Sequence, residues 1–404
     1  MPWKRISEMQ EREDFVKRAI QPRANISQLC LEFGISRSVG HKLVKRYREE
    51  GKKGIVPRSR KPKSHALEVS GEMVCEIVAL RKKYPRWGGA TLRELLLEKH
   101  QDVPSSRTVD RVLERAGLVR ERRTPRGRWL DREKLITPKY PNHVWTVDFK
   151  GWWNTRDRKP CFPLTVRDGY SRYMLGVHAL KGTSFEPTKE AFEELFERYG
   201  MPEEILSDNG SPFASVLSVQ GLTRLSAWWI KLGIHPRRIL PRCPFMNGSH
   251  ERMHKDMKAE LQTNPGWNIK DQQARFDEWR HTYNCIRPNQ AIGRKRPQAV
   301  YVKSSRPYPS TIPEFHYPIS MDVRRTSPRG YISWHQKPYF ISGAIPTETI
   351  GIEEEADSSM SLWFCELKLG STDRDFQRPL GGRENSPYSF RHARNKQPVS
   401  DVLS

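Results

Sequence analysis

The sequence has no long apolar run, few cysteines and a shortage of acidic side chains. No stretch approaches the roughly 18 consecutive apolar residues of a membrane-spanning helix, so we expect no membrane contact. The first residues, Met-Pro-Trp-Lys-Arg, lack the apolar segment of a secretory signal, which predicts a cytoplasmic protein. The 6 cysteines include no Cys-x-x-Cys pair, which argues against a zinc knuckle or a disulfide framework and fits a reducing compartment.

The shortage of acid leaves a large positive charge. Lys and Arg number 71 against 47 Asp and Glu, for a formal net charge of +24. This excess predicts a polyanionic partner, and nucleic acid is the leading one. Residues 1–140 carry +16 of the charge, so we expect the binding surface there. A chain of 404 residues should also hold several domains.

The first 56 residues have the pattern of a helix-turn-helix domain. Residues 26–33 form the first predicted helix, and Ser36 caps a second that runs to Tyr47. Apolar side chains at every fourth position from Val39 to Tyr47 are predicted to be buried. An amphipathic hairpin with a solvated basic face remains the alternative. The side chains expected to contact DNA are Arg37, His41, Lys42 and Lys45.

A second helical domain, of helix-turn-helix or winged-helix type, is predicted over residues 67–119, after a basic linker at 57–66. Ser105 or Ser106 caps its last helix. Arginines recur along one stripe of that helix, which suits a DNA groove, although pairing with neighbouring acids is equally open for any one of them. These arginines are Arg107, Arg111 and Arg115. Residues 120–140 read as a basic connector lying on DNA.

From residue 141 to 303 the pattern changes to an α/β domain. The predicted order β-β-β-α-β-α-β-α-α, with strands at 144–149 and 204–207 among them, implies a mixed sheet flanked by helices. Asp148 lies inside an apolar, strand-forming run, Asp208 directly follows a short strand, and Glu251 opens a helix. A carboxylate in a buried strand costs several kcal/mol unless its charge is compensated, and a divalent metal is the usual compensation. The three acids are therefore candidates for one metal site.

The C-terminal part is again strand-like. Short strands separated by Gly, Pro and polar turns, among them residues 317–322 and 362–367, predict a small SH3-like barrel over residues 317–370. Residues 371–404 are polar and poor in large aliphatic side chains, which predicts a disordered tail.

Three segments of the α/β domain carry a family likeness. They resemble the catalytic core of DDE transposases and retroviral-type integrases, above all the bacterial insertion-sequence transposases of the integrase-core group. The resemblance implies an RNase H-like fold in which Asp148, Asp208 and Glu251 bind two Mg²⁺ ions, with Mn²⁺ as a substitute. The segments are Val-Trp-Thr-Val-Asp148-Phe, Leu-Ser-Asp208-Asn-Gly-Ser-Pro-Phe and Asn247-Gly-Ser-His-Glu251-Arg-Met-His-Lys.

The same resemblance implies a reaction and partners. Water would free a 3′-OH at an element end, and that hydroxyl would attack target DNA by in-line displacement. The expected partners are double-stranded DNA, as terminal inverted repeats and target, and further copies of the chain, in a cytoplasmic, nucleoid-associated setting. A DNA-binding regulator or domesticated protein with an inactive core is the main alternative. An RNase H-type nuclease is the third.

Two lysines follow Glu251 on one face of the predicted helix. Lys255 and Lys258 stand four and seven positions further on, where both can reach phosphates entering the site. A surface ion pair between Lys255 and Glu251 is the alternative.

The interval between the second and third acids departs from the family pattern. Asp208 and Glu251 are separated by 42 residues, more than is usual, and we place the surplus in a polar surface loop at residues 215–223. Glu260 is the alternative third carboxylate. Asp168 is another acid in the region, interpreted as a turn residue.

Overall fold

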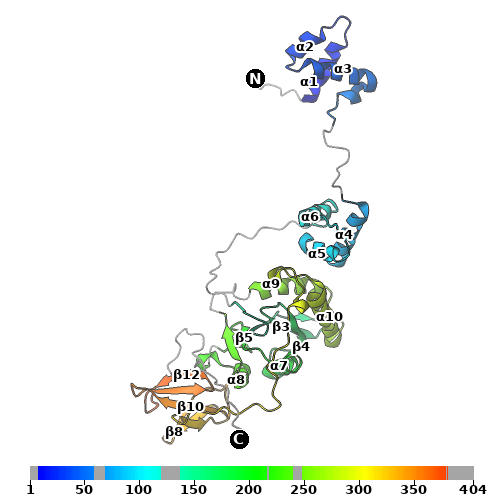
Figure 1. The fold of residues 1–404 in the computed structure, drawn as a ribbon. Helices are drawn as coiled ribbons and strands as arrows, with labels where there is room; N and C mark the ends of the chain where they lie inside the picture. Colours follow the sequence, from blue (N-terminus) through cyan, green and yellow to red (C-terminus); the bar gives the residue numbers. More distant parts are fainter. Residues whose placement is uncertain are drawn as a thin grey trace, which may run out of the picture. The chain divides into compact units, whose positions relative to one another are not determined.

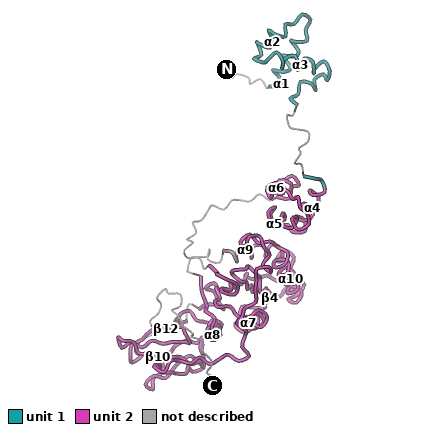
Figure 2. Tube along the Cα trace, viewed as in Figure 1, with its two compact units in different colours: residues 1–71 teal, residues 72–404 magenta. Residues whose placement is uncertain are grey.

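The computed structural model describes residues 8–58, 69–119, 137–215, 218–239, 248–378 and 380 (Figure 1). The chain divides into two compact units, residues 1–71 and residues 72–404 (Figure 2). Most of the predicted linker at 57–66 and connector at 120–140 lies outside the described residues. Among the helices of the described ranges, none combines the length and apolar character needed to cross a membrane.

The first unit is a small helical domain around Phe15, Leu29 and Leu43. Ser36 caps α3 as predicted, because its side chain accepts the N–H of Val39. The prediction that Val39 is buried is wrong, since it is 44% exposed and the buried stripe begins at Gly40. Leu43 is buried as predicted, Val44 is buried beside it, and Tyr47 is partly buried against the same core. The helices are α1 (Glu8–Ala19), which the sequence pattern missed, α2 (Ile26–Glu32), α3 (Arg37–Glu50) and the 3-10 helix Gly51–Ile55.

Gly40 explains the shift of that stripe. A Cβ atom at Gly40 would lie 2.3 Å from the sulfur of Cys30, so a larger residue would push α2 and α3 apart. The close approach turns the Gly40 face of α3 inward and leaves Val39 outside.

A second helical domain opens the second unit. Ser105 caps α6 by accepting the N–H of Thr108. Its core is formed by Ile77, Leu92 and Val109 together with neighbouring aliphatic side chains. The helices are α4 (Gly71–Lys83), α5 (Gly89–Leu97) and α6 (Ser106–Arg115).

The α/β domain that follows has the predicted order of strands and helices. Its main strands lie in the order β4-β3-β1-β5-β6, and the two-residue strand β2 pairs with the start of β3. β1 is antiparallel to β3 and parallel to β5. The strands are β1 (Val144–Phe149), β2 (Trp153–Asn154), β3 (Pro160–Asp168), β4 (Met174–Leu180), β5 (Glu204–Ser207) and β6 (His235–Arg238).

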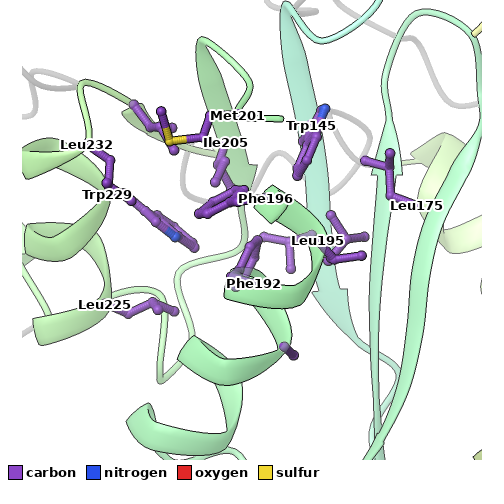
Figure 3. Packing of buried hydrophobic residues seen from close by; sticks show 14 of the residues in the cluster. Trp145, Leu175, Phe192, Leu195, Phe196, Met201, Ile205, Leu225, Trp229 and Leu232 are labelled. Atoms are coloured by element: carbon purple, nitrogen blue, oxygen red, sulfur yellow. The ribbon is translucent and has the colours of Figure 1, made fainter. Parts of the chain in front are cut away.

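Helices cover both faces of this sheet. On one face, Phe192 and Phe196 of α7 and Trp229 of α8 pack toward Trp145 of β1 (Figure 3). On the other face α9 and α10 contribute a separate apolar cluster centred on Phe276. The helices are α7 (Phe185–Tyr199), α8 (Arg224–Lys231), α9 (Gly248–Met257) with a π segment Lys258–Gln262, and α10 (Ile269–His281) with a π segment Thr282–Ile286.

The C-terminal strands form a four-stranded sheet, β12-β11-β10-β7, and a hairpin, β8-β9. A predicted strand over 317–322 is wrong, since β7 begins only at Asp322. A predicted single strand at 362–367 is divided by a turn at Cys365, where φ is 50°. The strands are β7 (Asp322–Arg325), β8 (Tyr331–Trp334), β9 (Lys337–Phe340), β10 (Thr349–Glu354), β11 (Met360–Phe364) and β12 (Leu367–Thr372).

The predicted disordered tail begins too early at residue 371. β12 continues to Thr372, and Phe376 is buried against Trp334 and Tyr339. One aromatic side chain thus extends the ordered part of the chain beyond the predicted boundary. Residues 381–404 of the predicted tail lie outside the described residues.

The segment predicted as a polar surface loop joins two parts of the second unit. Its 3-10 helix, Val219–Gly221, contacts β12, and Leu222 is buried in the apolar core of the C-terminal sheet together with Ala227 and Ile230 of α8. Lys231 pairs with Glu348 at 2.8 Å across the same boundary. The surface-loop prediction is therefore wrong at Leu222, because this residue anchors the C-terminal sheet.

Candidate active site

Asp148 lies near the C-terminal end of β1, next to Val147 of the main core. Neighbouring strand residues point to opposite faces, so Asp148 faces the side covered by α9. Its side chain is only 19% exposed. Burial and the negative charges of Asp208 and Glu251 raise the pKa of Asp148 to about 7, against an opposing effect of Lys150.

Asp208 follows β5, the strand beside β1. The two strands are parallel, and Thr146 is level with Leu206, each two residues before an aspartate. Asp148 and Asp208 therefore emerge at the same end of the sheet. Asp208 accepts the N–H of Gly210 through Oδ1 at 3.1 Å, which fixes the turn after β5.

Glu251 lies in the first turn of α9 and is exposed. Its charge acts on Asp148, so the structure brings the three predicted acids into electrostatic contact. Within the described ranges, no group of three or more His, Cys, Asp or Glu side chains is already arranged to hold a metal ion.

Glu260 and Asp168 have other roles in the structure. Glu260 accepts the indole N–H of Trp279 at 2.8 Å, and burial raises its pKa. Asp168 is buried at the end of β3 and accepts N–H groups from Asn142 and Ser171, as a turn residue does. Both carboxylates are engaged in holding the fold.

Two histidines that the sequence reading missed flank Glu251. His250 and His254 are buried, at 0% and 3% exposure, and both rings lie against the hydroxyl of Thr165. Burial lowers the pKa of His250 well below its usual range and that of His254 to about 3, so both are neutral. The sequence did contain a signal for these histidines: they are four positions apart, with Glu251 between them, and this spacing places both rings on one face of the predicted helix.

The cations of this region differ in position. Lys150, also missed from the sequence, follows β1 and acts electrostatically on both Asp148 and His254. Lys255 and Lys258 are exposed, and neither forms an ion pair with Glu251 or another acid of the described part. Phosphate contact by these lysines stays a prediction.

The predicted DNA contacts of the helical domains are exposed. In α6 the neighbouring acid Asp110 accepts the N–H of Gly89 at 3.0 Å, and the stripe of three arginines has no acidic partner within the described ranges. Among the four predicted contacts in α3, only Lys45 forms an ion pair with another described residue, Glu49, at 3.9 Å. The exposed side chains are Arg37, His41, Lys42 and Lys45 in α3 and Arg107, Arg111 and Arg115 in α6.

Family models match the three folded parts that carry these residues. Residues 11–63 match a helix-turn-helix domain and residues 39–113 a homeodomain-like domain. An integrase core domain matches residues 138–244, and a second integrase core model matches residues 232–297.

Several known proteins are similar to the chain. An uncharacterized 39.2 kDa protein of insertion element IS476 from Xanthomonas euvesicatoria is 30% identical over 226 residues, which cover 55% of this chain and 62% of that protein. An uncharacterized 31.7 kDa protein of insertion element IS407 from Burkholderia multivorans is 27% identical, covering 70% of this chain and 94% of that one. The HTLV-2 integrase catalytic core domain, solved with magnesium, is 18% identical over 41% of this chain and 99% of its own, with a TM-score of 0.31.

The fold and these matches define an integrase-core protein with N-terminal helix-turn-helix domains. The integrase core matches and the likeness to two proteins of bacterial insertion elements support a DDE transposase of the insertion-sequence type. The chain spans 62% of the length of the first relative and 94% of the second.

Proposed function

We propose that the chain is a DNA transposase that cuts the ends of its element and joins them to target DNA. The observation that carries the proposal is the position of the buried Asp148 and of Asp208 at the same end of two parallel strands, with Glu251 of α9 near enough for its charge to act on Asp148. Such a cluster is costly in a fold unless a cation offsets it, and it lies at the strand ends of an integrase core.

The donor set fits hard divalent cations. Asp148, Asp208 and Glu251 offer only carboxylate oxygens, the ligands that Mg²⁺ prefers and Mn²⁺ also accepts. Two such ions, held by these three carboxylates, would supply activation of the attacking oxygen and neutralisation of charge on the leaving oxygen at phosphorus. Lys150, Lys255 and Lys258 would contact the phosphates on either side of the reacting one.

The reaction would exchange phosphoester bonds without a covalent protein intermediate. In the first step a water oxygen attacks phosphorus at the element end, and the 3′-oxygen leaves as a hydroxyl. In the second step that 3′-OH attacks a target phosphodiester, and the target's own 3′-oxygen leaves. The helical domains would bind terminal inverted repeats, and two ends would require more than one copy of the chain.

The C-terminal strands complete the proposal. We infer that the two small sheets form an SH3-like barrel that adds a DNA-binding or assembly surface to the core. Their anchoring on α8 through Leu222 supports a fixed position beside the catalytic domain.

Single substitutions of the carboxylates test the proposed activity. Asp148→Asn and Glu251→Gln should bind DNA from the ends of the element as the unmodified protein does, yet lose strand cleavage in Mg²⁺. The matched control is Glu260→Gln, which keeps an acceptor for Trp279 and should cleave normally. Cleavage by Asp148→Asn at the unmodified rate would rule out this site and favour the alternative of a DNA-binding regulator.

A further inference from the structure

α9 attaches Glu251 to the sheet through the two histidines on its buried face. His250 and His254 point toward β1 and β3, and their rings meet edge to face with centroids 4.7 Å apart. Glu251 stands between them on the exposed side. The ring positions therefore fix how α9, and with it Glu251, lies against the strand that carries Asp148.

Four polar side chains form a continuous series from the sheet to Asp148. Thr146 Oγ1 lies 3.0 Å from His250 Nδ1, and His250 Nε2 lies 2.6 Å from Thr165 Oγ1. Thr165 Oγ1 lies 2.7 Å from His254 Nε2, and His254 Nδ1 lies 3.4 Å from Asp148 Oδ2. Strand pairing holds Thr165 directly opposite Asp148.

The hydrogens of this series have one consistent order when Asp148 is ionised. A carboxylate only accepts, so Nδ1 of His254 must carry the hydrogen that faces it. A neutral imidazole has one N–H, so Nε2 of His254 accepts the hydroxyl hydrogen of Thr165. Thr165 then accepts the Nε2–H of His250, whose Nδ1 accepts from Thr146. Each group donates once toward Asp148.

Two alternative acceptors lie beside the series. The Thr165 hydroxyl also lies 2.9 Å from the carbonyl oxygen of Asp148, and the Thr146 hydroxyl lies 3.3 Å from that of Arg167. Donation to the Asp148 carbonyl would leave Nε2 of His254 without a donor or, in the other tautomer of His254, a bare Nδ1 facing a carboxylate oxygen, which is repulsive. An ionised Asp148 therefore favours the ordered series. The link between His254 Nδ1 and Asp148 Oδ2 is the longest of the series, at 3.4 Å.

We propose that Thr146, His250, Thr165 and His254 are positioning residues, a one-directional hydrogen-bond chain that orients the Asp148 carboxylate for a divalent cation. The proposal rests on the metal site of the proposed function. Partners of this kind commonly change metal affinity about 10- to 100-fold when they are removed.

Thr165 allows a matched test. Thr165→Val keeps the branched shape but removes the hydroxyl that joins the two rings, whereas Thr165→Ser keeps the hydroxyl. Mn²⁺ binding to the full-length chain, followed by the loss of the free-ion electron paramagnetic resonance signal, should weaken about 10-fold or more in Thr165→Val and remain near the unmodified value in Thr165→Ser. His254→Phe should behave like Thr165→Val, and His254→Asn should recover part of the affinity, since its amide N–H replaces that of Nδ1.

A thermal unfolding curve of each variant separates positioning from folding. If the hydrogen-bond series only stabilises the fold, Thr165→Val will have a lower unfolding midpoint but an unchanged Mn²⁺ affinity in its folded state. That result overturns the proposal. Asp148→Asn serves as the reference. If Asp148→Asn binds Mn²⁺ as the unmodified protein does, the proposed metal site itself is wrong. If Asp148→Asn loses Mn²⁺ binding while Thr165→Val and His254→Phe keep it, the metal site stands and only the proposed role of the hydrogen-bond series is wrong.

Discussion

Asp148 is a carboxyl group whose ionised form the folded protein disfavours. Its pKa rises from 3.8 to about 7 because it is buried beside two other acids. Between those values the folded state binds more protons than the unfolded state, so the contribution of Asp148 to stability falls as pH rises. A neutral Asn at this position removes that loss.

The first prediction is a pH-dependent gain in stability for Asp148→Asn. At pH 8 without divalent ions its unfolding midpoint should exceed that of the unmodified chain, by the equivalent of on the order of 2 to 4 kcal/mol. The gain should shrink toward pH 4, where the carboxyl is protonated in the folded state. Comparing the two proteins at each pH cancels the opposite effect of His250 and His254. A gain that does not change with pH would contradict the raised pKa.

The three acids were identifiable from sequence, but their surroundings were not. An acid inside the apolar run of β1 stands out in any reading of the chain. The histidines beside Glu251 did not, because their role depends on Thr146 and Thr165, which are distant in sequence and become neighbours only through the pairing of β1 with β3. Lys150 was missed for a similar reason: a cation just after a strand is ordinary until its distance to Asp148 is known.

At the scale of elements, α6 presents three exposed arginines on one face. A phosphate contact releases counterions from DNA, so each lost contact should reduce the salt slope of binding by about 1. The second prediction is that Arg111→Ala weakens DNA binding and flattens its dependence on salt, measured by fluorescence anisotropy at several salt concentrations. Lys99→Ala is the control, since Lys99 is paired with Glu76 at 3.2 Å. If the salt dependence of DNA binding is unchanged in Arg111→Ala, Arg111 makes no phosphate contact, and α6 serves the packing of its domain instead.

The segment before α8 gives a prediction about stability. Leu222 is 1% exposed and lies in the core of the C-terminal sheet, so Leu222→Ala should destabilise that sheet by about 2 to 5 kcal/mol through lost burial and a cavity. Chemical unfolding followed by hydrogen exchange in β11 and β12 measures the loss. Val302→Ala, at a side chain that is 66% exposed, should change stability by no more than about 0.5 kcal/mol. Equal effects of the two substitutions would contradict an anchoring role for Leu222.

Local patterns predicted the elements of the α/β domain well because its strands are apolar and its helices amphipathic. β1 and β5 were placed with their observed bounds. The errors lie where tertiary contacts override local pattern. Val39 is turned outward by the close approach at Gly40, and the polar stretch before Leu222 hides a single anchoring side chain. Phe376 likewise extends order into a segment of disordered composition.

At the scale of the whole molecule, basic helical domains lie in two separate compact units. The first unit, residues 1–71, has its own buried core around Phe15 and Leu43 and is joined to the second by a short basic stretch. If both units bind the same DNA end, the second contact forms within one molecule at high effective concentration. Linked binding of this kind typically raises affinity by about 10²- to 10⁴-fold over either part alone.

The last prediction therefore concerns the connection between the units. A chain of residues 72–404 should bind its element end at least about 100-fold more weakly than the full chain, and adding residues 1–71 as a separate protein should not restore the affinity. Gel-shift titration at fixed salt measures both, and Mn²⁺ binding by residues 72–404 shows that the catalytic domain is intact. Recovery in trans would mean that the first unit acts through protein contacts. A loss of threefold or less would mean that residues 1–71 do not bind the DNA end. If they did bind it, their removal would also remove the high effective concentration that the covalent link gives, and the affinity would fall much further.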